Sequence, residues 1–183
     1  MTRAFVLLIE GFEEIEAVTV ADVLDRAKIP VELVGVETHE VVGAHKITLR
    51  ARMLLSELTL RATDLVVLPG GMPGATSLRD HVGVQQLLRN AADVGATLAA
   101  ICAAPIALEA AGLLNGKHAT SFPGFRLPSA HYSEERVVED GNVVTSRAPG
   151  TALEFALALV ARCCGPERAA TLAADMLVFV PPR

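Results

Sequence analysis

The sequence has no tryptophan, one tyrosine and no cluster of basic residues. Lysine and arginine together number 16 against 21 aspartate and glutamate residues, which gives a formal net charge of -5 at pH 7. A protein that binds nucleic acid needs grouped cations for the phosphates and aromatic side chains for the bases. We therefore expect no nucleic-acid partner.

Long hydrophobic runs are also missing, although 51% of the residues are hydrophobic. The first apolar run covers residues 4–9 and stops at Glu10, well short of the roughly 20 residues that span a bilayer. No small-residue cleavage site of a signal peptide follows it. We expect neither a membrane segment nor an export signal.

Cysteine is scarce, with Cys102, Cys163 and Cys164 as its three occurrences. A disulfide between adjacent cysteines is strained, and no cysteine and histidine spacing matches a zinc site. The sequence therefore predicts a reduced, cytoplasmic protein with no metal and no cofactor. The five histidines are scattered, and we expect them on the surface or in packing roles.

The chain has the length of one domain, residues 1–183. Short apolar runs alternate with segments of helical periodicity, and residues 140–142 are typical of a hairpin turn. Strands are expected over 4–9, 31–36, 64–68, 97–101 and 118–122, and helices over 13–28, 84–94, 106–111, 151–163 and 167–177. This alternation predicts an α/β fold with a mostly parallel central sheet, helices on both faces, and a ligand site at the carboxyl ends of the strands.

Cys102 stands between a predicted strand and a predicted helix, as the nucleophile of a sharp strand-to-helix elbow does. Such a turn requires small neighbours, and Ala100 and Ala104 supply them. A thiol at a helix N-terminus favours its thiolate form, so we expect a low pKa at Cys102 alone. A buried, inert cysteine remains the alternative. Cys163 and Cys164, near a helix C-terminus, are interpreted as packing or incidental thiols.

Two further segments follow predicted strands. Gly70 and Gly71 can turn the chain sharply and point backbone N–H groups at a ligand, although a plain loop would look the same. Glu13, Glu14 and Glu16 crowd the first turn of a helix, where most should be solvated. Glu16 is the expected exception, a desolvated carboxyl that is protonated near neutral pH and serves as acid, base or hydrogen-bond donor.

Four segments in this order, residues 10–17, 66–74, 99–105 and 145–151, together resemble the ThiJ/PfpI superfamily. Their nearest likeness is to the branch of the Parkinson-disease-associated protein deglycase and the bacterial YajL-like proteins. The resemblance implies a flavodoxin-like sandwich and a homodimer. It also implies a site in which Glu16 hydrogen-bonds the Cys102 thiolate, Gly71 and Ala103 form an oxyanion hole from their N–H groups, and the partner subunit contributes Arg147 and Pro149. Glu13, Gly70 and Phe122 would form a secondary pocket.

Three departures from the family pattern limit which family activities and contacts we expect in this protein. Phe122 stands where several members have a histidine, so no histidine is left as general base. Ala103 follows the cysteine where protease-like members have a histidine, which makes proteolysis improbable. The segment Ala44-His45-Lys46 replaces a Ser-Arg-Gly that is common in the family, which puts in doubt any dimer contact made by that arginine.

Two functions from different classes remain. In the first, the protein is a deglycase or glyoxalase that acts on methylglyoxal, glyoxal or their early adducts on amines and thiols, in defence against carbonyl and oxidative stress. In the second, it is a redox-sensing stress protein or holdase chaperone in which Cys102 is oxidised. An interaction module with a relic pocket is a weaker third possibility.

Overall fold

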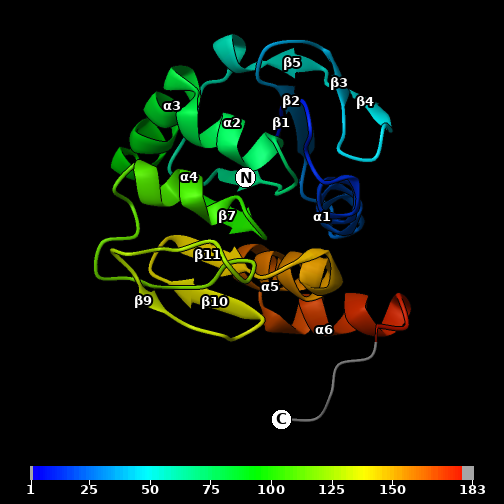
Figure 1. Ribbon diagram of the computed structural model, residues 1–183. Helices are drawn as coiled ribbons and strands as arrows, with labels where there is room; N and C mark the ends of the chain where they lie inside the picture. Colours follow the sequence, from blue (N-terminus) through cyan, green and yellow to red (C-terminus); the bar gives the residue numbers. More distant parts are fainter. Residues whose placement is uncertain (1, 179–183) are drawn as a thin grey trace.

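The computed structural model describes residues 2–178 and places a seven-stranded sheet at its centre, in the order β10-β11-β7-β6-β1-β2-β5 (Figure 1). All neighbouring strands are parallel except the hairpin of β10 and β11. The strands are β1 (Ala4–Leu8), β2 (Val31–Gly35), β5 (Met53–Leu54), β6 (Leu65–Leu68), β7 (Thr97–Ile101), β10 (Val137–Asp140) and β11 (Val143–Ser146). The mostly parallel sheet expected from the sequence is confirmed.

Helices cover both faces of this sheet, because its central strands are apolar on both sides. In β1, the alternate residues Ala4, Val6 and Leu8 join one buried cluster, whereas Phe5 and Leu7 join the other. The first cluster includes α1 (Glu14–Arg26), α5 (Ala152–Cys164) and α6 (Pro166–Asp175), and the second includes α2 (Gly74–Asp80), α3 (Val82–Asp93) and α4 (Pro105–Ala110). Among residues 2–178, no helix is both long enough and apolar enough to cross a membrane.

The structure differs from the sequence prediction in three regions. It adds α2 and, between residues 37 and 63, the elements β3 (Glu40–Val42), β4 (Thr48–Arg50), β5 and the short helix η1 (Leu55–Glu57). The strand expected over 118–122 is reduced to β8 (His118–Ala119), paired with β9 (His131–Tyr132). It stops there because the next backbone N–H groups have other partners: that of Thr120 donates to Thr145 Oγ1, and that of Phe122 to the Cys102 carbonyl.

Four adjacent strands, β11, β7, β6 and β1, end at the same edge of the sheet, because they are parallel neighbours. The segments that follow them carry Arg147, Cys102, Gly70 and the glutamates of α1 respectively. Residues from four distant parts of the sequence therefore meet at the edge where open α/β sheets bind their ligands.

Candidate active site

Cys102 forms the expected elbow between β7 and α4. Its backbone has a φ of 64°, a left-handed conformation that costs a non-glycine residue about 1–3 kcal/mol. Two hydrogen bonds hold it: its N–H donates to the Ser146 carbonyl at 2.9 Å, and its carbonyl accepts the Phe122 N–H at 2.8 Å. The backbone segments around Ser146 and Phe122 therefore hold the elbow from both sides and fix the direction of the thiol.

Gly70 and Gly71 approach the cysteine too closely for any side chain. A Cβ at Gly70 would lie 2.7 Å from the Cβ of Cys102 and 2.9 Å from Oε2 of Glu16. Gly71 has a φ of 88°, and its N–H and that of Ala103 both hydrogen-bond the sulfur, which lowers the thiol pKa. The two N–H groups predicted to form an oxyanion hole thus converge on the reactive atom.

Glu16 reaches the same point from α1 and is completely buried. Its Oε2 accepts the Gly70 N–H at 2.6 Å, and the carboxyl is hydrogen-bonded to the Cys102 thiol. Burial is the main reason that the pKa of Glu16 rises to about 7, with the charge of Glu13 adding to it and the two hydrogen bonds opposing it. The pKa of Glu16 is thus raised by burial, as expected from the sequence, and protonation of Glu16 at neutral pH stays a prediction.

The expected low pKa of Cys102 is wrong. Burial, then the negative charge of Glu16 and its hydrogen bond with the thiol, raise the pKa of Cys102 to about 12, although the Ala103 and Gly71 N–H groups act in the opposite direction. Helix α4 has only six residues, so its dipole is too weak to outweigh burial beside a carboxylate. The proton therefore rests on the sulfur, and Glu16 is the carboxylate placed to accept it.

The prediction that most glutamates of this turn are solvated is also wrong, since Glu13 and Glu14 are buried like Glu16. Glu14 accepts N–H donors from His45 at 2.8 Å, Ile47 at 3.3 Å and the His45 ring at 3.0 Å. Burial alone would raise the pKa of Glu14, but the backbone N–H groups and the His45 ring outweigh it and lower the pKa. Glu14 thus ties loop 43–47 to α1, and a Cβ at Gly43 would collide with its carboxylate.

His45, expected on the surface or in a packing role, contacts two buried glutamates at the start of α1. Its Nδ1 lies 3.0 Å from Glu14 and 3.6 Å from Glu13, and hydrogen bonding to Glu14, with the charges of both carboxylates, raises the pKa of His45. In the described part of the chain, these three residues alone bring possible metal ligands within 4.8 Å of one another. The replacement of Ser-Arg-Gly by Ala44-His45-Lys46 was the available signal.

The remaining predicted site residues lie around this centre. Phe122 is 40% exposed and contacts the elbow through its N–H. Arg147 is half-buried and directly follows Ser146, whose carbonyl accepts the Cys102 N–H. Pro149 begins the short helix η2 (Pro149–Thr151). The approach of Arg147 and Pro149 from a partner subunit stays a prediction.

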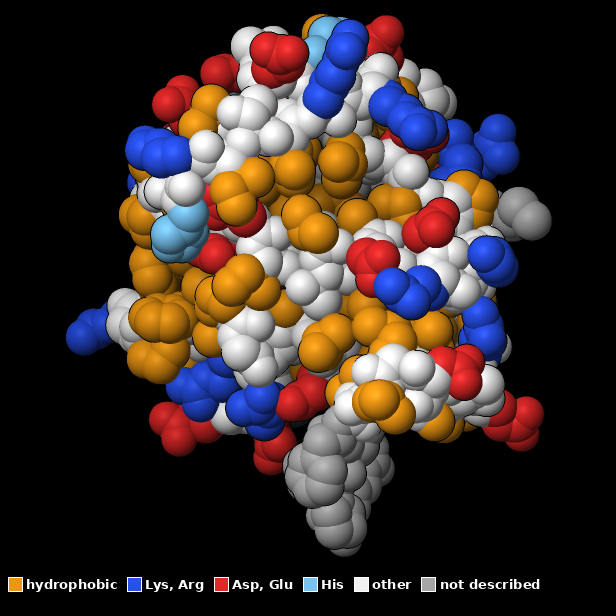
Figure 2. All heavy atoms as spheres, turned by 90° about the vertical axis from the view of Figure 1, so that its right-hand side faces the viewer, with side chains coloured by type: hydrophobic (Ala, Val, Ile, Leu, Met, Phe, Trp, Pro, Cys, Tyr) orange, Lys and Arg blue, Asp and Glu red, His pale blue; other side chains and the backbone are white. Residues whose placement is uncertain are grey.

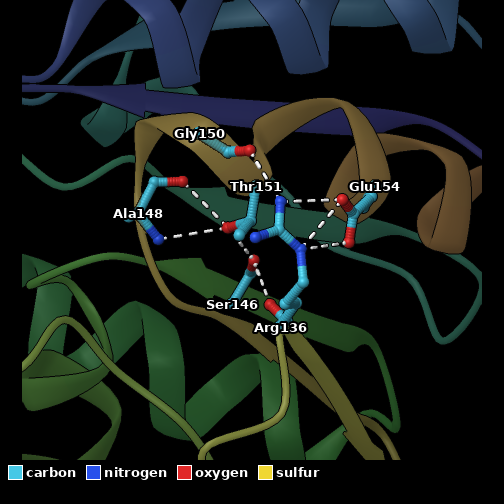
Figure 3. Close-up of polar contacts among 6 residues, drawn as sticks. All are labelled: Arg136, Ser146, Ala148, Gly150, Thr151 and Glu154. Carbon is cyan, nitrogen blue, oxygen red and sulfur yellow. Dashed lines mark hydrogen bonds and ion pairs between the residues drawn. The ribbon is translucent and has the colours of Figure 1, made fainter. Parts of the chain in front are cut away.

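A network of polar contacts fixes the loop that carries Arg147 and Pro149 (Figure 3). Ser146 Oγ lies 2.6 Å from Thr151 Oγ1 and donates to the Arg136 carbonyl at 2.7 Å. The Arg136 guanidinium in turn contacts Glu154 at 2.8 Å and donates to the Gly150 carbonyl at 2.9 Å. We call this network the Arg136 clamp; it joins β11 to the start of α5.

Cys163 and Cys164 lie at the end of α5, far along the chain from the elbow, and all three cysteines are free. Cys163 packs against a buried cluster, and burial followed by the charge of Cys164 raises its pKa. This environment agrees with the packing role expected for Cys163.

The sequence and the fold of this chain are similar to those of several known proteins. The family model described as the DJ-1/PfpI family matches residues 2–162. Protein DJ-1 homolog B of Arabidopsis thaliana is 42% identical over 96% of this chain, which spans only 41% of that relative. Protein dj-1beta of Drosophila melanogaster is 37% identical, with 96% of both chains covered. The crystal structure of Drosophila DJ-1beta superposes with a TM-score of 0.91 at 36% identity, over 98% of this chain and all of that one. The glutathione-independent glyoxalase DJR-1.2 of Caenorhabditis elegans is 32% identical, with 89% of both chains covered.

Proposed function

The chain belongs to the DJ-1/PfpI family, and on that premise we propose that it is a cofactor-independent, cysteine-dependent enzyme of the glyoxalase or deglycase type. Its substrates are methylglyoxal, glyoxal or their early adducts on amines and thiols, and its role is defence against carbonyl and oxidative stress. The relative named a glutathione-independent glyoxalase supports the general kind of activity.

The observation that carries this proposal is the pairing of Cys102 with Glu16. The thiol holds its proton and is hydrogen-bonded to a buried carboxyl whose pKa, raised by burial, is about 7. A base of that pKa is half ionised at neutral pH, which suits proton transfer in both directions. Glu16 therefore supplies the general base that the family's histidine, replaced here by Phe122, cannot supply.

The reaction balances without a redox partner. As Glu16 takes the thiol proton, the sulfur bonds to the aldehyde carbon, and the N–H groups of Gly71 and Ala103 stabilise the oxyanion that forms. Glu16 returns the thiol proton to this oxyanion, which gives a hemithioacetal; with an adduct substrate the carrier amine or thiol leaves with that proton instead. Glu16 then takes the proton of the former aldehyde carbon and delivers it to the neighbouring carbonyl carbon, while the hydroxyl proton of the first carbon passes to the oxygen of the second. The first carbon is thereby oxidised and the second reduced. Water hydrolyses the resulting thioester to a hydroxy acid, lactate or glycolate, and restores the thiol.

A redox-sensing stress protein, or holdase chaperone, is the second candidate. Glu16 Oε1 has no hydrogen-bond partner among the described residues, so a protonated Glu16 has an oxygen free to donate to an oxidised sulfur. In this alternative, hydrogen peroxide oxidises Cys102 to the sulfenic and then the sulfinic acid, with one water released at each step, and the stable sulfinate is the signal.

The proposed enzyme is a cytoplasmic homodimer. Four apolar side chains are 41–57% exposed on or beside α1 and the start of α5: Ile15, Val18, Ile47 and Leu153. Figure 2 shows hydrophobic side chains gathered across the face that carries α1 and α6. A patch of this kind is typical of a protein interface. The three free thiols are in keeping with a reducing compartment.

The decisive experiment is a steady-state glyoxalase assay on the purified protein, with lactate measured as product. We expect turnover of methylglyoxal in the wild type and in the control variant Cys164→Ser, and none in Cys102→Ser. If the wild type shows no turnover but peroxide gives a stable sulfinate at Cys102, the redox alternative replaces this proposal.

A further inference from the structure

A recess with a volume of about 550 Å³ opens beside the elbow. Its walls include the side chains of Phe125, Leu127 and Tyr132, and its charged residues are Arg126, Glu134 and Arg147. This volume lies in the range of small-molecule sites, and both apolar and charged residues line the recess. The reaction proposed above takes place at the sulfur and leaves this recess unused.

Two backbone contacts place the recess next to the nucleophile. The Cys102 carbonyl accepts the Phe122 N–H, and Phe122 directly precedes the segment that begins the wall; its ring contacts that of Phe125 at 6.4 Å between centroids. The Cys102 N–H donates to the Ser146 carbonyl, and Arg147 follows immediately. The rim of the recess therefore begins one residue beyond each of the two backbone partners of Cys102, Phe122 and Ser146.

The charges of the recess favour an anion. Neither Arg126 nor Arg147 has a carboxylate within ion-pair distance among residues 2–178, so both cations are available to a ligand. The same holds for five arginines outside the recess: Arg50, Arg52, Arg61, Arg89 and Arg168. Arg147 donates one N–H to the Glu134 carbonyl at 2.8 Å, and its other side-chain N–H groups have no partner among residues 2–178. The recess holds two guanidinium groups and one carboxylate, that of Glu134, so its net charge is one positive charge. One carboxylate on a ligand would neutralise it.

The loop that presents Arg147 is held in place before any ligand arrives. The Arg136 clamp bonds the residues on both sides of it, at Ser146 and at Gly150 and Thr151 (Figure 3). A preorganised cation loses less conformational entropy on binding than a free surface arginine. Arg147 is therefore better suited to bind an anion than a free surface arginine, whereas Arg126 is itself exposed.

We propose that this recess binds the carboxylate of the molecule that carries the aldehyde, so that the preferred substrates are adducts on carriers of the amino-acid type. As a statement about substrates it rests on the proposed function. Arg126 and Arg147 are its anion-binding residues, and Phe125 and Tyr132 flank the carrier. Free methylglyoxal, which has no carboxylate, uses only the Cys102 end of the site.

The kinetic test uses two carriers that differ in charge alone. The hemithioacetals of methylglyoxal with N-acetylcysteine and with N-acetylcysteine amide are compared as substrates. We expect kcat/KM to be about tenfold higher for the acid, through KM, as a charge-assisted hydrogen bond allows. Arg126→Gln removes this preference, whereas Arg89→Gln, which deletes an exposed arginine of α3, retains it. Equal kcat/KM values in the wild type would overturn the subsite.

A binding measurement separates this inference from the proposed function. In the Cys102→Ser protein, the side-chain Nε–Hε signals of the arginines are followed by NMR while N-acetylcysteine or its amide is added. We expect the acid, and not the amide, to shift Arg126 and Arg147. Turnover of both adducts without these shifts overturns the subsite alone. Acid-specific shifts without any turnover overturn the proposed reaction and leave a carboxylate-binding recess.

Discussion

Two carboxyl groups on opposite sides of the first turn of α1 have pKa values that are shifted in opposite directions. Glu14 and Glu16 are two residues apart in α1, about 200° around the helix axis, and both are buried. Glu14 faces loop 43–47 and accepts three N–H donors from it, whereas Glu16 faces Cys102 and accepts one backbone N–H and the bond with the thiol. The pKa of Glu14 is lowered and that of Glu16 is raised to about 7, with burial the largest influence on each.

Depth of burial and the number of N–H donors act together to set the charge of these carboxyl groups. Glu16 lies deep in the protein with one backbone N–H donor, whereas Glu14 lies nearer the surface and has three N–H donors, each of which stabilises the ionised form. A fully bonded carboxylate such as Glu14 is fixed in charge and serves as an anchor. An underbonded one such as Glu16 can exchange its proton at neutral pH and can take part in chemistry.

The largest expected effect comes from removing the exchangeable carboxyl. Glu16→Gln should lower kcat for methylglyoxal by at least about a hundredfold, because proton transfer by a placed side chain contributes about 10²–10⁴-fold. Cys102 should still form a covalent adduct with the aldehyde, detectable by mass spectrometry. Glu14→Gln should retain turnover within about tenfold. Full turnover in Glu16→Gln would make Glu16 a structural residue like Glu14.

The pH profile provides the second test of the difference. Since the base must be ionised, kcat/KM should fall about tenfold for each pH unit below the Glu16 pKa of about 7, which burial sets. Alkylation of Cys102 by iodoacetamide should follow the same rise with pH. In the alkylation assay, the decrease in rate below pH 7 should disappear in Glu16→Gln and persist in Glu14→Gln. A limb unchanged in Glu16→Gln would assign the titration to another group.

Stability should respond to the two substitutions with opposite signs. A carboxyl whose pKa rises from 4.5 to about 7 on burial makes the folded state less stable as pH increases between these values, by up to about 3 kcal/mol. Glu16→Gln should therefore raise the free energy of unfolding at pH 8 and have no such benefit at pH 4.

Glu14 has the opposite linkage, because its pKa is lowered in the folded state. Its contribution is present above the ordinary pKa of 4.5 and is lost as pH falls through the folded value. Glu14→Gln should cost about 1–3 kcal/mol at pH 7, since it leaves buried N–H donors poorly paired. Urea denaturation of both variants at pH 4, 6 and 8 checks the two signs, and parallel changes would refute the distinction.

The smallest expected effect is that of His45, the exposed partner of Glu14. Hydrogen bonding to Glu14 raises its pKa, so its contribution is present below its ordinary pKa of 6.5 and is lost as pH rises through the folded value. His45→Gln should lower the melting temperature slightly at pH 5.5 and hardly at all at pH 9, with turnover at pH 9 changed less than twofold. A loss of turnover at pH 9 would connect His45 to the catalytic side.

The sequence predicted the parts of this architecture that depend on local pattern. The apolar runs of β1, β6 and β7 are buried on both faces, and the elbow needs small residues around Cys102, so both were visible along the chain. Helix α2 was missed because Gly74-Ala75-Thr76-Ser77 shows no apolar periodicity.

The state of the glutamates was not predictable in the same way. The donors that fix Glu14 come from loop 43–47, thirty residues away, and nothing in a run of three glutamates indicates which of them will meet such a loop. The same reasoning applies to Cys102, whose pKa is raised by burial and by Glu16, 86 positions earlier in the chain. Local pattern identified the reacting residues, and long-range contacts determined their protonation.

The strand order also determines when the site can form on a growing chain. Glu16 is synthesised early, but β6 must insert between β1 and β7 before Glu16 meets Cys102, and the Cys102 N–H finds its acceptor only when Ser146 has emerged. Glu16 and the thiol can meet once β7 has been made, but the elbow is complete only after Ser146, 44 positions beyond Cys102, has been synthesised. A nascent chain that ends before Ser146 therefore lacks one of the two backbone contacts that hold the elbow.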